Sequence, residues 1–130
     1  MSQNTIIESK ILIVDDEPSN IEYLKEIMEI TRITDVDSTT SAKLAFEKYA
    51  STHYDLVLLD INMPELSGFE VLERFAQLNK TNPAKVVMLS GHCDNAIKQK
   101  ALKLGANDML SKPFDIGSFI NCVEKTLCIG

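Results

Sequence analysis

A chain of 130 residues, 45% of them hydrophobic and only four of them proline, has the length and composition of one ordinary globular domain. A domain of this size buries about two-thirds of the surface that its unfolded chain exposes, so we expect it to fold without a disulfide or a structural metal. The formal net charge of −6 argues against binding to nucleic acid through a general basic surface.

The three cysteines, Cys93, Cys122 and Cys128, are an odd number and lack the spacing of metal ligands. Reduced thiols in a cytosolic protein are their simplest interpretation. Residues 1–9 have neither the basic start nor the apolar core of a signal peptide, and no apolar run approaches the length of a membrane span. We therefore expect a short N-terminal tail over residues 1–9 and a cytoplasmic domain over residues 10–130, with no membrane or nucleic-acid partner.

The first half of the chain predicts two strands and two helices in alternation. Residues 10–14 are an apolar run that predicts a strand, and Pro18 suits the first turn of a helix that continues to about residue 30. Residues 33–37 predict a weaker strand. Thr40 or Ser41 can then cap a second helix that ends near residue 50.

The second half continues the same alternation. The apolar run 56–59 predicts a central buried strand over residues 55–59, and this strand ends at the carboxylate of Asp60. Helices are expected from Gly68, after a cap at Asp94 and after a cap at Asp115, with strands over 85–89 and 108–110 between them. The buried stripe of the last helix is predicted to hold Ile116, Phe119, Ile120, Val123 and Leu127.

Five strands that alternate with five helices predict an α/β fold. Strands that lack internal polar alternation favour a parallel sheet covered by helices on both faces. In an open sheet of this kind ligands bind beyond the carboxyl ends of the strands. Five residues that can carry chemistry fall just past such ends: Asp15, Asp16, Asp60, Ser90 and Lys112. We expect them to share one pocket.

With these residues assembled, the chain resembles the receiver domain of two-component response regulators over nearly its whole length. Four motifs in the right order carry the resemblance: ILIVDDE at 11–17, LLDINMP at 58–64 with Ser67-Gly68, MLSG at 88–91 and LSKPF at 110–114. The resemblance implies a flavodoxin-like (βα)5 fold, a three-layer sandwich whose five-stranded parallel sheet has the order 2-1-3-4-5.

The resemblance also implies a chemistry. Asp60 would be the phosphoacceptor, and a histidine kinase or a phosphotransfer protein would supply the phosphoryl group from a phosphohistidine. Asp16, Asp60 and the backbone carbonyl of Asn62 would hold Mg²⁺, with Asp15 beside them, acting directly or through water. Such a domain catalyses only its own modification, and we do not expect an enzyme that acts on other substrates.

Two further residues would contact the phosphoryl oxygens, namely Ser90 through its hydroxyl and Lys112 through its charge. The resemblance favours a cis peptide bond between Lys112 and Pro113, which would aim the lysine into the pocket. Physical reasoning supports the need for cations here. Two unit charges ~4 Å apart repel by about 4 kcal/mol at an effective dielectric constant of ~20, so clustered acids that meet a phosphoryl group require positive charge. Hard oxygen ligands suit Mg²⁺.

One departure from the family leaves a second function open. Three residues before Lys112 the family usually carries a tyrosine or phenylalanine whose ring moves when Ser90 engages the phosphoryl group, and here the residue is Met109. A phosphate-independent interaction module is therefore the alternative. A third class, an aspartyl-phosphate phosphohydrolase, usually requires an acid two residues after the nucleophile, where this chain has Asn62.

Other properties stay open at this stage. His92 and Asn62 match family positions that adjust how fast a phosphoaspartate hydrolyses, and an exposed loop histidine is an equally good interpretation of His92. A basic strip on the fourth helix, Lys98, Lys100 and Lys103, is more simply a solvated face than a nucleic-acid site. The output protein or effector domain is unknown, and a homodimer is possible.

Overall fold

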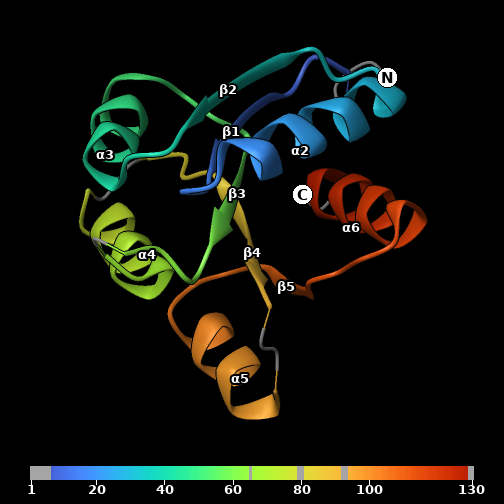
Figure 1. Ribbon diagram of the computed structural model, residues 1–130. Helices are drawn as coiled ribbons and strands as arrows, with labels where there is room; N and C mark the ends of the chain where they lie inside the picture. The colour runs from blue at the N-terminus through green and yellow to red at the C-terminus, as the bar shows by residue number, and fades with distance from the viewer. Residues whose placement is uncertain (1–6, 65, 79–80, 92–93, 129–130) are drawn as a thin grey trace.

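The computed structural model describes residues 7–64, 66–78, 81–91 and 94–128. Five parallel strands form one sheet with the order β2-β1-β3-β4-β5, as predicted (Figure 1). The strands are β1 (Lys10–Val14), β2 (Asp35–Thr39), β3 (Leu56–Asp60), β4 (Lys85–Ser90) and β5 (Asp108–Ser111). The helices are α2 (Pro18–Thr31), α3 (Ala42–Ser51), α4 (Gly68–Gln77), α5 (Asn95–Lys103) and α6 (Ile116–Cys128).

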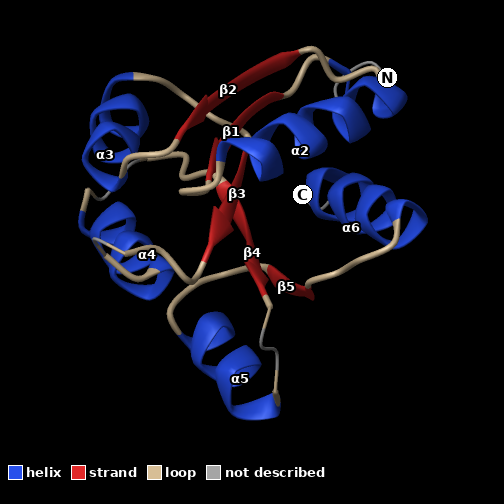
Figure 2. Cartoon of the chain, in the orientation of Figure 1, coloured by secondary structure: helices blue, strands red, loops and turns tan. Residues whose placement is uncertain are grey.

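The helices form two layers, one on each face of the sheet. Helices α2 and α6 cover one face, and α3, α4 and α5 cover the other (Figure 2). Successive residues of β3 point to opposite faces, so Leu56 and Leu58 pack with α2 and α6, whereas Val57 and Leu59 pack with the other three helices. Because both faces are covered, the first four residues of the strand are all apolar, and only its last residue, Asp60, is polar.

Helix α4 begins very close to the end of β3, and Gly68 permits this approach. Ser67 and Glu70 form a reciprocal capping box, and the Gly68 N–H donates to the Ile61 carbonyl oxygen at 2.7 Å. A Cβ atom at Gly68 would lie 2.5 Å from the Asp60 carbonyl oxygen and 2.7 Å from Ile61 Cα. The absence of a side chain at Gly68 therefore fixes the distance between α4 and the backbone of Asp60.

Two details differ from the sequence predictions. The second strand is Asp35–Thr39, two residues later than predicted, because Ile33 is buried in the core ahead of the strand and pairing with β1 begins at Asp35. Ile116 was expected in the buried stripe of the last helix, but its side chain is 43% exposed. The helix buries a stripe that starts one turn later, and its buried residues are Phe119, Cys122, Val123 and Thr126.

The edge strand β2 is held by a polar network at the amino end of the sheet. Lys10 Nζ lies 2.9 Å from Asp35 Oδ1 and 3.8 Å from Asp37 Oδ2. The hydroxyl of Tyr54, a residue that is only 1% exposed, donates to Asp37 Oδ2 at 2.6 Å. Charge and hydrogen bonds thus add to the limited apolar packing of this strand, in which Val36 contacts the core.

None of the helices within the described ranges is long and apolar enough to span a membrane.

Candidate functional site

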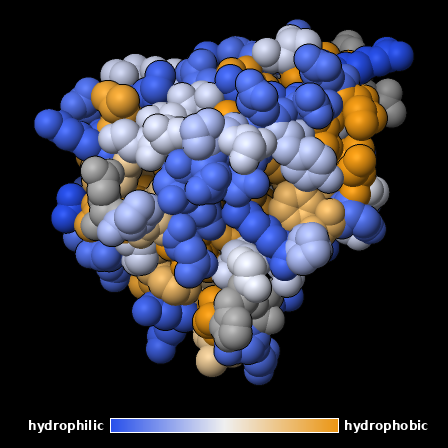
Figure 3. All heavy atoms as spheres, viewed as in Figure 1, coloured by the Kyte–Doolittle hydropathy of each residue, from blue (hydrophilic) through white to orange (hydrophobic). Residues whose placement is uncertain are grey.

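Three acidic residues meet where β1 and β3 end. Asp60 is the last residue of β3, and Asp15 and Asp16 directly follow β1. One carboxylate oxygen from each residue lies within 4.8 Å of the other two. Asp15 is fully buried and Asp60 is 4% exposed, whereas Asp16 is half-buried. Hydrophilic side chains occupy the middle of the face shown in Figure 3, over the region where these two strands end.

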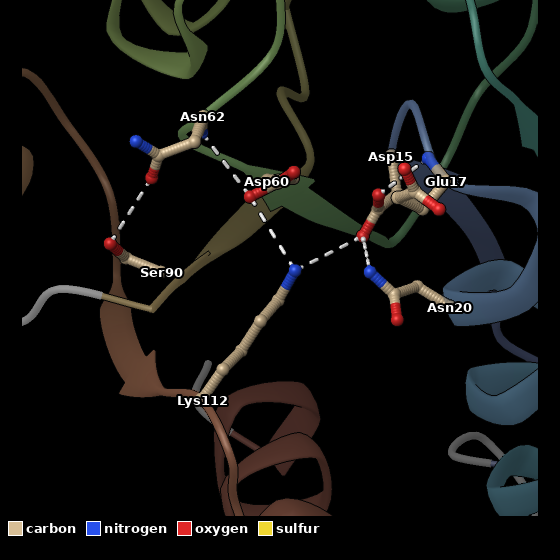
Figure 4. Close-up of polar contacts among 7 residues, drawn as sticks. All are labelled: Asp15, Glu17, Asn20, Asp60, Asn62, Ser90 and Lys112. Atoms are coloured by element: carbon tan, nitrogen blue, oxygen red, sulfur yellow. Dashed lines mark hydrogen bonds and ion pairs between the residues drawn. The ribbon is translucent and has the colours of Figure 1, made fainter.

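Lys112, which follows β5, spans two of the acids (Figure 4). Its Nζ lies 3.3 Å from Asp15 Oδ2 and 3.6 Å from Asp60 Oδ1. The Lys112–Pro113 peptide bond is cis, as the resemblance implied. A single ammonium group therefore faces three carboxylates, and the pocket keeps a surplus of negative charge.

Asp15 is held by donors on both of its oxygens. Oδ1 accepts the Glu17 N–H at 2.9 Å, and Oδ2 accepts the side-chain amide of Asn20 at 3.4 Å beside the ammonium of Lys112. A fully buried carboxylate requires such donors, since leaving it unpaired would be strongly unfavourable. These contacts fix the orientation of the Asp15 carboxylate.

Ser90 and Asn62 lie on the other side of Asp60. Ser90 is the last residue of β4 and is 1% exposed, and its hydroxyl donates to Asn62 Oδ1 at 3.4 Å. The Asn62 N–H in turn donates to Asp60 Oδ1 at 3.2 Å. In Figure 4 the Ser90 hydroxyl points to Asn62, whereas Lys112, from the loop after β5, reaches Asp60 and Asp15. A hydroxyl at the end of β4 and an ammonium from the loop after β5 thus lie on different sides of Asp60.

Burial raises the pKa of Asp60 to about 6. The charge of Lys112 opposes this rise in pKa, and the neighbouring negative charge of Asp15 adds to it. Without a further cation, ionisation of Asp60 is therefore less favourable in the folded chain than in the unfolded chain. The donor set fits such a cation, because three clustered carboxylates are hard oxygen ligands of the kind that Mg²⁺ prefers.

The raised pKa of Asp60 predicts how removal of its charge changes the free energy of unfolding. Since the folded-state pKa is raised, the folded chain binds more protons than the unfolded chain between about pH 4 and pH 6, and stability falls as pH rises through that window. With EDTA present, Asp60→Asn should match the wild type near pH 4 and exceed its free energy of unfolding by about 2 kcal/mol above pH 6. Urea denaturation across this pH range measures the difference.

The matched control for this experiment is Glu73→Gln, which makes the same change of charge at an exposed position of α4. It should leave the free energy of unfolding within about 0.5 kcal/mol of the wild type at every pH. An Asp60→Asn chain that is no more stable than the wild type at pH 7 would contradict the prediction.

The structure thus places all six predicted site residues in one region: Asp15, Asp16, Asp60, Asn62, Ser90 and Lys112. Asn20 was missed by the sequence analysis. It lies one turn before Leu24, which is 2% exposed, so a polar amide on the apolar stripe of the first helix was the available signal. His92 and Cys93 lie outside the described residues.

The phosphate-independent alternative rested on Met109, whose side chain is 5% exposed within the core shared with α3, α4 and α5. Methionine fills this space as an apolar core residue, which gives no support to the alternative. His53 lies away from the pocket and its Nε2 is 3.3 Å from Asp55 Oδ1 on the exposed surface.

Comparison with known proteins gives one consistent result. A family model described as "Response regulator receiver domain" matches residues 11–124. The chain is 36% identical over 119 residues to response regulator ArlR of Staphylococcus saprophyticus, with 92% of the chain and 52% of the relative covered. It is also 36% identical over 116 residues to a probable cyclic di-GMP phosphodiesterase of Vibrio cholerae, with 89% of the chain but 26% of the relative covered.

The chain therefore spans from about a quarter to about half the length of these two relatives. Among solved structures, a two-component response regulator from Clostridium difficile superimposes with a TM-score of 0.83 at 26% identity, over 92% of this chain and 96% of that chain. This likeness extends the agreement from the motifs to the whole fold, and the predicted flavodoxin-like topology is confirmed.

Proposed function

This chain belongs to the family of response regulator receiver domains, and we propose from that membership that it is the phosphoacceptor of a two-component signalling system. Asp60 accepts the phosphoryl group, and residues 10–130 form the receiver domain behind a tail of residues 1–9. The observation that carries the proposal is the cluster of Asp15, Asp16 and Asp60 oxygens with the Lys112 ammonium between two of them.

The reaction transfers a phosphoryl group from a phosphohistidine to a carboxylate oxygen of Asp60. The N–P bond breaks, its electron pair stays with the imidazole, and an O–P bond forms. Both partners are negatively charged, and the transition state spreads charge over the equatorial oxygens, so positioned donors govern the rate. Lys112 provides an ammonium near Asp60 Oδ1, and Ser90 provides a hydroxyl from the neighbouring strand.

Asp16, Asp60 and the backbone carbonyl of Asn62 would hold Mg²⁺, with Asp15 beside them. When bound, the ion supplies positive charge that offsets the repulsion between the carboxylates and the phosphoryl oxygens. The protein residues have their own tasks. Asp15 holds Lys112 in place, and the Asn62 N–H orients the Asp60 side chain through its contact with Oδ1.

The partners follow from the same proposal. The phosphoryl donor is a histidine kinase or a phosphotransfer protein, and the phosphorylated domain acts on an output protein or on an effector domain. The relatives support the second possibility, because ArlR and the probable phosphodiesterase both extend well beyond the matched region. The chain catalyses only its own phosphorylation and dephosphorylation.

Intact mass spectrometry tests the proposal. After incubation with acetyl phosphate and Mg²⁺ the chain should gain the mass of one phosphoryl group, and EDTA should prevent the gain. Asp60→Asn identifies the acceptor, and Glu73→Gln serves as the control with the same change of charge. A wild-type chain that stays unmodified, or a modification that persists in Asp60→Asn, would overturn the proposal. Turnover of small phosphate esters would point instead to a phosphohydrolase.

A further inference from the structure

Asn20 is a further residue that contacts the site, through Asp15. It lies in the first turn of α2, and its side-chain amide donates to Asp15 Oδ2 at 3.4 Å. Lys112 Nζ contacts the same oxygen at 3.3 Å. Figure 4 shows the amide and the ammonium meeting this one atom from different elements. Both distances are long for hydrogen bonds to a carboxylate, so either bond has room to shorten.

The Lys112 ammonium cannot stay equally close to Asp15 and to a phosphoryl group on Asp60. Before the reaction its ammonium lies closer to Asp15 than to Asp60, at 3.3 Å against 3.6 Å. A phosphoryl group on Asp60 carries up to about two negative charges and three strong acceptor oxygens, which draw the ammonium away from Asp15. Asp15 is fully buried, so losing its charged donor would cost free energy unless another donor stays on that oxygen.

We propose that Asn20 is a positioning residue for phosphoryl transfer, because its amide keeps a donor on Asp15 Oδ2 while Lys112 turns to the phosphoryl group. The N–H···O bond from Asn20 shortens as the ammonium withdraws. Asp15 then keeps its orientation, and Lys112 is released at a smaller free-energy cost. This inference rests on the proposed function of Asp60, and its tests separate the two.

The structure provides room for this exchange. Asp15, Asn20 and Lys112 line one cavity of about 410 Å³, together with apolar residues of α2 and of the loop after β5. Lys112 keeps 26% of its side chain exposed, whereas Asp15 keeps 1%. The ammonium can therefore move within the cavity, and the buried carboxylate depends on the donors fixed around it.

Replacement of Asn20 by residues of different chemistry tests the inference. Asn20→Leu removes the donor and places an apolar side chain one turn before buried Leu24. It should slow phosphorylation by acetyl phosphate about three- to tenfold while the thermal midpoint stays unchanged or rises. Asn20→Gln keeps an amide N–H and should be faster than Asn20→Leu. Ser19→Ala, at the exposed neighbouring position of α2, should match the wild-type rate.

The outcomes are distinct. If Asn20 served only packing, Asn20→Leu should react at least as fast as Asn20→Gln, because leucine suits the apolar stripe better. A faster reaction of Asn20→Gln would therefore indicate a positioning role. If Asn20→Leu reacts as fast as Ser19→Ala while the wild type is modified, the inference is wrong and the proposed function stands. Slow reaction of both Asn20 variants with lowered thermal midpoints would also overturn it. A wild-type chain that takes up no phosphoryl group overturns both.

A second measurement does not depend on phosphorylation. In ¹⁵N-labelled protein, the side-chain amide protons of Asn20 report the length of their hydrogen bond. Lys112→Met removes the competing donor from Asp15, so one of these protons should move downfield relative to the wild type. Lys103→Met, which removes an exposed lysine on α5, should leave it in place. An unchanged Asn20 resonance in Lys112→Met would contradict the exchange of donors.

Discussion

Lys112→Met should slow phosphorylation of Asp60 roughly a hundredfold at fixed acetyl phosphate and Mg²⁺, the scale seen when one positioned donor to a transition state is removed. Methionine has a similar unbranched length but no charge. The ammonium lies 3.3 Å from Asp15 Oδ2 and 3.6 Å from Asp60 Oδ1, and no other lysine or arginine among the described residues forms an ion pair with either acid. The initial rate of mass gain measures the effect.

Lys103→Met is the matched control for this experiment, since it removes the same group from an exposed position of α5. Its rate should stay within about twofold of the wild type, because Lys103 is exposed and forms no described ion pair with Asp15 or Asp60, and water and salt screen exposed charges. Equal rates for the two lysine variants would show that positive charge at Lys112 has no part in the reaction.

Gly68→Ala should have the largest effect on stability. A methyl group at this position would lie 2.5 Å from the Asp60 carbonyl oxygen and 2.7 Å from Ile61 Cα, and both of these are backbone atoms that cannot turn aside as a side chain can. We expect the free energy of unfolding to fall by about 2–3 kcal/mol. For a domain of this size the thermal midpoint should fall by roughly 10 °C.

Gly117→Ala provides the comparison within the same chain. The nearest neighbour that its new methyl group would meet is Asp115 Oδ1 at 4.0 Å, and the residue lies in α6. Alanine is favoured over glycine in helices by about 1 kcal/mol, so this variant should be unchanged or slightly more stable. A Gly68→Ala chain as stable as Gly117→Ala would show that α4 can move away from β3 easily.

The strands could be predicted wherever burial dictates residue type. Residues 56–59 are apolar because both faces of β3 are covered, and the carboxylate of Asp60 could be placed at the end of the strand from that run alone. Strand β2 was placed two residues early because its sequence is polar. Its stability comes from pairing with β1 and from Lys10, and a contact between residues 10 and 35 leaves no periodic signal in the chain.

The site, too, could be predicted only in part. Its acids and Lys112 could be predicted because each follows a recognisable strand and parallel strands end at the same edge of the sheet. The contact between Asn20 and Asp15 depends on how α2 is rotated about its axis over the sheet, and that rotation comes from packing of the whole helix. The sequence therefore shows that Asn20 is a polar residue beside the apolar stripe, but it does not show that Asp15 is its partner.

The charged edge of the sheet has a consequence for how copies of this protein meet in concentrated solution. An outer strand with free backbone groups is a template on which another chain can add a strand, and aspartate and lysine along such a strand discourage that addition. Asp35 and Asp37 are committed to Lys10 and Tyr54, so a neighbouring molecule that aligned along β2 would have to disrupt or desolvate these pairs. These pairs therefore oppose fibre-like growth along β2, and they lie at the amino ends of the strands, whereas Asp60 lies at the carboxyl end of β3.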